Sequence, residues 1–159
     1  MRRALDATYA IALWAAIACL VSIAVLVGLQ VGGRIVDALL RAFGFGRSGF
    51  VILSLSEIAG YLLAAASFLG LAATLKGGVH IRVTMLINNV PLKVRSVLEG
   101  GALLFGTIAA SYATWHLGQY AYTTWRFNEV SPGLVPVPLY IPQVAMVVGA
   151  VLLAIAFLD

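Results

Sequence analysis

Long uncharged, apolar runs are the feature of this sequence that most restricts its fold. A helix needs about 20 consecutive apolar residues to cross the hydrocarbon core of a bilayer. The sequence offers four such stretches, at about residues 8–30, 50–75, 97–122 and 139–158. We therefore predict an all-α membrane protein, with four transmembrane helices in a single transmembrane domain over residues 1–159.

The composition agrees with lipid as the surrounding solvent. Hydrophobic residues make up 62% of the chain and charged residues only 10%, whereas soluble domains carry about a quarter charged residues. The formal net charge is +4, but no run of basic residues could grip a phosphate backbone. We assign the excess charge to cytoplasmic loops and lipid head groups, and expect no nucleic-acid partner.

The first apolar run resembles a signal peptide only superficially. Thr8–Gln30 follows a basic start, but it is longer than the apolar part of a signal peptide. No small-residue cleavage site follows it. We therefore expect this run to be retained as the first helix.

The segment after the first run has the pattern of an amphipathic helix over about 33–43. Its apolar side holds Ile35, Val36, Leu39, Leu40 and Phe43, and its polar side holds Arg34, Asp37 and Arg41. Such a helix is expected to lie in the plane of the membrane surface. Gly44 and Gly46 would then let the chain turn into the second span.

The two later connections differ in character. Pro91, preceded by Asn89, reads as the start of the third helix. A helix from Pro91 to about Trp125 exceeds the bilayer thickness, so it must tilt or project. The connection Arg126–Pro138 contains three prolines, which predicts an extended, semi-rigid loop.

Basic residues in the short loops predict the topology, because they are more numerous on the cytoplasmic side. One side would carry Arg2, Arg3, Lys76, Arg82, Lys93 and Arg95. The other would carry Arg34, Arg41, Arg47 and Arg126. We therefore predict that both termini are cytoplasmic.

Glu57 and Tyr61 are the polar residues of the second span that invite a functional interpretation. An ionisable group inside a span is costly and usually serves a purpose. One interpretation is a proton or cation site. The other is that Glu57 lies at interface depth, near Arg47, or is satisfied by a neighbouring chain.

Small residues recur on the third and fourth spans at helical spacing. They are Gly100, Thr107, Ser111, Thr114 and Gly118 on the third, and Ala145, Gly149, Ala150 and Ala154 on the fourth. Such faces let helix backbones approach closely in lipid. We expect them to serve packing within the bundle.

The sequence gives no pattern typical of an enzyme, a metal site or a cofactor site. Cys19 is the single cysteine, so paired-thiol chemistry is excluded. His80 and His116 could suggest the haem of an electron-transfer anchor, but such ligands must lie at similar depth. His80 is expected outside the hydrocarbon and His116 within the third span. We expect no catalytic activity and no cofactor.

Residues around the second connection resemble a known family. Glu57-Ile58-Ala59-Gly60-Tyr61 leads through Phe68-Leu69-Gly70 to Lys76-Gly77-Gly78-Val79-His80-Ile81-Arg82-Val83, followed by Pro91, Arg95 and Leu98-Glu99. This pattern resembles the small membrane (Q-type) subunit of the tripartite ATP-independent periplasmic (TRAP) transporters. The likeness covers nearly the whole chain in length, span number and loop placement, and the Gly-x-His-Ile-Arg-Val block is its most specific part.

The resemblance implies a role and partners. In that family a periplasmic binding protein delivers an organic acid to a membrane complex, whose large subunit binds substrate and sodium and moves as an elevator. The small, non-catalytic subunit packs against the stationary scaffold and widens it in the membrane. The implied location is a bacterial or archaeal inner membrane with both termini cytoplasmic, and the implied partners are the large subunit, the binding protein and membrane lipids.

Two groups of residues are candidate contact sites under this resemblance. In the second connection, we expect Gly77, Gly78, His80 and Arg82 to fix the turn and to contact lipid or the partner subunit. In the third, exposure and rigidity predict that Trp125, Arg126, Glu129 and Pro132 form part of the docking surface for the binding protein. The alternative function is a self-sufficient four-helix exporter, proton-coupled through Glu57.

Overall fold

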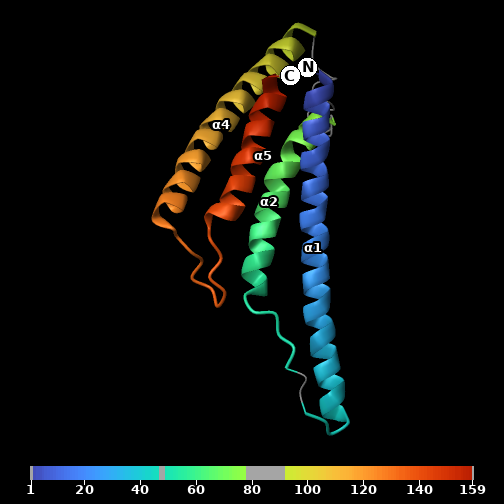
Figure 1. Ribbon diagram of the computed structural model, residues 1–159. Coiled ribbons are helices and arrows are strands. Elements are labelled where there is room, and N and C mark those ends of the chain that lie inside the picture. Colours follow the sequence, from blue (N-terminus) through green and yellow to red (C-terminus); the bar gives the residue numbers. More distant parts are fainter. Residues whose placement is uncertain (1, 47–48, 78–91, 159) are drawn as a thin grey trace.

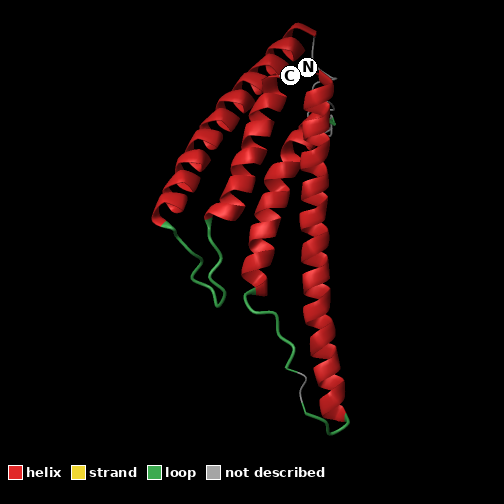
Figure 2. Ribbon diagram, viewed as in Figure 1, coloured by secondary structure: helices red, strands yellow, loops and turns green. Residues whose placement is uncertain are grey.

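The computed structural model describes residues 2–46, 49–77 and 92–158, and within them the chain forms four helices (Figure 1). The helices are α1 (Arg2–Ala42), α2 (Leu55–Lys76), α4 (Leu92–Phe127) and α5 (Tyr140–Leu158). Figure 2 shows loops between them in the described part. The predicted all-α fold is confirmed.

The four helices stand side by side in one row, in the order α1, α2, α5, α4 (Figure 1). α2 packs against both α1 and α5, and α5 packs against α4. Both labelled ends of the chain lie at the same end of the helix bundle, and the loop between α4 and α5 lies towards the opposite end (Figure 1). Direction therefore alternates along the chain, and the neighbouring helices α2 and α5 run in the same direction, opposite to α1 and α4.

Alanine dominates the buried core of the described part. Its buried hydrophobic residues are Tyr9 and eight alanines, whereas Leu104 and Phe105 are 66% and 75% exposed. Helices in lipid associate through close packing of small residues, because lipid tails are as apolar as leucine. The large apolar side chains on the outside therefore fit a surrounding bilayer.

Glycines set the approach of neighbouring helices at two places. A Cβ at Gly149 of α5 would overlap the backbone of Phe68 on α2 and lie 2.8 Å from the nitrogen of Leu69. A Cβ at Gly106 of α4 would lie 2.6 Å from Cζ of Phe157 on α5. The contact at Gly149 agrees with the prediction that small residues of the fourth span pack within the bundle.

α1 is longer than the sequence pattern predicts. It has 41 residues, or roughly 60 Å at 1.5 Å per residue, about twice the hydrocarbon thickness of a bilayer. The helix continues through residues 33–43, so the amphipathic segment is joined to the first span and a separate in-plane helix is not confirmed. Gly32 and Gly33 weaken a helix but keep their N–H donors, and only proline would remove one.

The end of α1 follows the predicted glycine turn. Gly44 has φ +77°, a conformation that glycine adopts without steric cost. Its N–H donates to the Arg41 carbonyl at 3.1 Å, and the Phe45 N–H donates to the Leu40 carbonyl at 2.8 Å. This pair of bonds is a Schellman motif, which satisfies the last carbonyls of the helix.

Three of the four described helices are long and apolar enough to cross a membrane, namely Leu5–Ala42 within α1, α2 and α5. α4 is not among them, so the predicted number of four spans is not confirmed. Polar side chains such as Ser111, His116 and Gln119 interrupt its apolar sequence. With 36 residues, α4 does agree with the prediction of a third helix longer than the bilayer is thick.

Candidate functional site

Glu57 joins the start of α2 to the loop between α4 and α5 (residues 128–139, the α4–α5 loop). It lies in the first turn of α2, where a negative charge is favoured by the helix dipole. Its half-buried carboxylate accepts a hydrogen bond at Oε1 from the Tyr61 hydroxyl at 3.0 Å, and another from the Ser131 hydroxyl. The carboxylate is therefore satisfied within the chain itself, by a residue 74 positions away.

Further contacts hold the α4–α5 loop against the same helix end. The Gly133 N–H donates to the Ser131 hydroxyl oxygen at 3.1 Å, and the Val135 N–H donates to the Ser54 hydroxyl oxygen at 3.2 Å. A Cβ at Gly133 would overlap the Glu57 carboxylate. Ser131 is only 3% exposed, so this side of the loop is packed against the bundle.

The two arms of the α4–α5 loop also bond to each other. The Ser131 N–H donates to the Val137 carbonyl at 2.9 Å, and the Leu139 N–H donates to the Glu129 carbonyl at 3.1 Å. An isolated antiparallel bridge pairs Val130 with Pro138. The extended, semi-rigid connection predicted from the three prolines is thus a narrow hydrogen-bonded ribbon.

A second Schellman motif fixes the point where α4 passes into the loop. Asn128 has φ +50°, and asparagine tolerates this conformation better than most residues. Its N–H donates to the Trp125 carbonyl at 3.3 Å, and the Glu129 N–H donates to the Thr124 carbonyl at 3.1 Å. Thr124 is fully buried, so the base of the loop is anchored in the bundle.

The predicted docking residues are all exposed. Trp125 is 59% exposed, and Arg126, Glu129 and Pro132 are exposed as well. Four large apolar side chains of the same region are also exposed: Phe127, Val130, Leu134 and Val135. The loop region therefore offers apolar and charged side chains together, while Ser131 and Thr124 face inwards.

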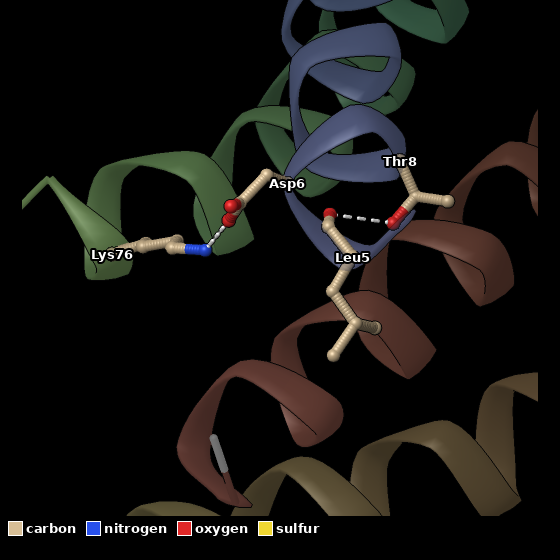
Figure 3. Close-up of polar contacts among 4 residues, drawn as sticks. All are labelled: Leu5, Asp6, Thr8 and Lys76. Atoms are coloured by element: carbon tan, nitrogen blue, oxygen red, sulfur yellow. Dashed lines mark hydrogen bonds and ion pairs between the residues drawn. The ribbon is translucent and has the colours of Figure 1, made fainter. Parts of the chain in front are cut away.

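At the opposite end of the bundle, an exposed ion pair joins α1 and α2. Lys76, the last residue of α2, pairs with Asp6 near the start of α1 (Figure 3). Its ammonium also lies 5.0 Å from the centroid of the Tyr9 ring. The side chains of Lys76 and Asp6 are 40% and 54% exposed, so water screens this pair.

The predicted contact residues of the second connection are only partly described. Gly77 is the C-cap that follows α2, and its N–H donates to the Ala73 carbonyl at 3.0 Å. Its φ of −66° is available to any residue. Gly78, His80 and Arg82 lie outside the described residues.

His116 packs against an aromatic ring of its own helix. The ring of Tyr112 lies 4.3 Å from it, centroid to centroid, at an interplanar angle of 54°. Within the described residues, no group of three or more His, Cys, Asp or Glu side chains could hold a metal ion. His80, the second histidine of the haem alternative, lies outside the described residues.

Sequence reasoning singled out Glu57 and its partner Tyr61, but missed the contacts that join this end of α2 to the α4–α5 loop. Ser131 and Ser54 are ordinary loop serines in the sequence, and nothing in their spacing marks them as contacts of α2. Gln30 was missed as well: it is 7% exposed and accepts from the Ile52 N–H at 2.7 Å. The sequence held one signal for this contact with Ile52, namely a polar glutamine at the end of an apolar run.

The comparisons with known proteins give one family. Residues 35–159, well over half of the chain, match the family described as tripartite ATP-independent periplasmic transporters, DctQ component. No curated protein and no solved structure matches the chain.

Proposed function

The chain belongs to the DctQ family of tripartite ATP-independent periplasmic transporters, and from this premise we propose that it is the scaffold on which the large membrane subunit moves. The resemblance found in the sequence is confirmed by the family match. The family makes the chain a component of a membrane transporter. The proposal adds the mechanical role of a stationary wall.

The single row of helices is the observation that carries this proposal. The principal contacts run from α1 to α2, from α2 to α5 and from α5 to α4 (Figure 1). A row leaves broad helix faces for neighbours, whereas a pathway inside one chain needs helices that enclose it. A flat bundle with large apolar side chains outside is suited to widening a partner in the membrane.

We propose that the large subunit covers the groove between α4 and α5. This groove, of about 580 Å³, is lined on α4 by Ser111, Thr114, Trp115, Gly118, Gln119 and Tyr122. Polar groups facing lipid are costly unless they are hydrogen-bonded. Membrane helices associate through small residues and hydrogen-bonding side chains. The Thr114 hydroxyl already donates to the Ala110 carbonyl, but Ser111, Gly118 and Gln119 of this groove are small or hydrogen-bonding residues of that kind. They favour a protein neighbour over lipid.

A matched pair of glycine variants tests this placement. Gly118 on α4 and Gly60 on α2 both have open space where a Cβ would stand. We expect Gly118→Leu to reduce the large subunit recovered with this chain by about tenfold, through overpacking of the contact. Gly60→Leu should leave recovery within a factor of about two, since this account leaves that face to lipid. If Gly60→Leu reduced recovery and Gly118→Leu did not, the partner would instead lie on the α1–α2 face.

The remaining family features enter the proposal as expectations. The large subunit would carry an organic acid with sodium, after delivery by a periplasmic binding protein. Both termini would be cytoplasmic, with Gly77, Gly78, His80 and Arg82 contacting lipid or the large subunit there. The α4–α5 loop would be periplasmic, and Trp125, Arg126, Glu129 and Pro132 would take part in docking of the binding protein. Exposure of these four side chains supports the docking proposal.

The exporter alternative is not favoured. Glu57 would be its coupling carboxylate, yet Oε1 of that carboxylate already accepts hydrogen bonds from Tyr61 and Ser131. Purification of the tagged chain in mild detergent, co-expressed with its genomic neighbours, separates the two functions. We expect a larger, many-spanning protein in equal amount. A lone chain or homodimer that exports a small molecule by itself, coupled to protons, would overturn the proposal.

A further inference from the structure

We propose that Glu57 is a positioning residue, which fixes the α4–α5 loop as a preformed platform for the soluble binding protein. This inference rests on the proposed function, because it needs a transporter fed by such a protein. It assigns Glu57 a role outside ion translocation. It also makes docking depend on a side chain that the binding protein does not touch.

The Glu57 carboxylate holds the inner side of the α4–α5 loop. Glu57 accepts from the hydroxyl of Ser131, and that hydroxyl in turn accepts from the Gly133 N–H at 3.1 Å. A Cβ at Gly133 would overlap the carboxylate. The glycine therefore lets the loop backbone come down onto Glu57, and the serine links the carboxylate to that backbone.

The outer side of the loop region exposes a surface suited to a protein partner. Phe127, Val130 and Leu134 are 68%, 52% and 79% exposed. Arg126 and Glu129 add one charge of each sign, and the loop holds no further charged residue. An anionic membrane surface attracts clusters of basic residues. Mixed charge around exposed apolar side chains instead favours a protein surface with its own mixed charges.

A loop that is ordered before binding avoids an entropic cost when the partner docks. Immobilising a flexible segment at an interface lowers affinity, and holding it in the bound conformation beforehand avoids that cost. The cross-loop bonds from Ser131 to Val137 and from Leu139 to Glu129 give the ribbon its shape. Glu57 gives the ribbon its place on α2. Without Glu57, the shape would persist, but the platform would be held on α2 less firmly, by the bond from the Val135 N–H to the Ser54 hydroxyl.

The test uses the complete transporter in proteoliposomes, with uptake measured against the concentration of substrate-loaded binding protein. We expect Glu57→Ala to raise the binding-protein concentration for half-maximal uptake about tenfold, the effect of losing a hydrogen bond to a charged group. The maximal rate at saturating binding protein should stay near that of the unchanged protein. Glu57→Gln keeps an acceptor oxygen, so it should recover most of the loss.

Two controls separate positioning from general damage. Tyr61→Phe removes the other hydrogen bond to Glu57 but no loop contact, and should leave half-saturation within a factor of about two. Ser131→Ala removes the loop donor without touching any charge, and should reproduce the Glu57→Ala result even if that variant assembles poorly. Gly46→Ala, in the other described loop and with open space around its Cβ, should have no effect.

A cycle of variants tests the contact itself. Gly133→Ala should raise half-saturation, because its Cβ overlaps the carboxylate. In the Glu57→Ala background the same change should add less than a factor of about two. Half-saturation that is unchanged in both Glu57→Ala and Ser131→Ala would overturn the inference, as would a lower maximal rate at unchanged half-saturation. Uptake that never required this chain would instead overturn the proposed function.

Discussion

A carboxylate joins two elements at each end of the bundle, but the two contacts differ in burial. At the loop end, Glu57 of α2 is half-buried and meets Ser131, which is 3% exposed. At the terminal end, Asp6 of α1 pairs with Lys76 of α2 while both side chains remain 40% or more exposed. The first contact joins a loop to a helix, and the second joins two helices that already pack together.

This difference indicates that the loop end is the better-fixed end of the molecule. Exposed ion pairs typically contribute about 0.2–1 kcal/mol, because water and salt screen them. Removing one partner of a hydrogen bond to a charged group costs about 1.5–3 kcal/mol. The side proposed to receive the binding protein is therefore held by the stronger contact.

The largest loss of stability is expected for a substitution midway between the two ends, in the α2–α5 contact. The contacts at both ends depend on this packing. A Cβ at Gly149 would overlap the backbone of Phe68, so Gly149→Ala should lower the free energy of unfolding by about 2–3 kcal/mol. Gly60→Ala is the matched control, because it meets open space and gains up to about 1 kcal/mol of helix propensity. Thermal unfolding in detergent measures both. Equal stability of the two variants would contradict the described helix contact.

The next effect is local to the loop end. Glu57→Ala should release the α4–α5 loop and speed hydrogen exchange at the amides of Ser131 and Val135 by roughly tenfold. Amides in the middle of α5 should keep their protection. Asp6→Ala is the counterpart at the terminal end and should leave exchange in the loop unchanged. Faster exchange throughout the bundle in Glu57→Ala would mean that Glu57 supports the whole fold and not the loop alone.

The smallest effect is expected for the ion pair itself. Lys76→Ala or Asp6→Ala should each lower the free energy of unfolding by no more than about 1 kcal/mol, and the double variant should show little further loss. The stability difference between each single variant and the unchanged protein should shrink as salt rises, since the pair is exposed. Thermal unfolding at low and high salt measures this. A loss equal to that of Gly149→Ala would remove the contrast between the two ends.

The sequence predicted the helical class and most helix positions, because apolar runs of bilayer length have few other uses. α2 and α5 begin and end within a few residues of the predicted spans, at Leu55–Lys76 and Tyr140–Leu158. The continuity of α1 was missed, because an amphipathic pattern fits an in-plane helix and the end of a long helix equally well. The number of spans was not confirmed, because the polar residues of α4 lower its hydropathy.

The candidate site was predicted in part. Glu57 stood out because an acidic residue inside an apolar run is unusual, but its contact with Ser131 spans 74 positions and follows no periodic pattern. Exposure of the docking residues followed from the prolines of their loop. The contact that positions this loop depends on tertiary packing, which one sequence does not display.

Reconstituted uptake tests the central claim most directly. Proteoliposomes would contain the large subunit with or without this chain, and uptake would be followed after addition of loaded binding protein and a sodium gradient. The account predicts uptake only when all three proteins are present, and none from this chain alone. Full uptake by the large subunit and the binding protein without this chain would contradict it.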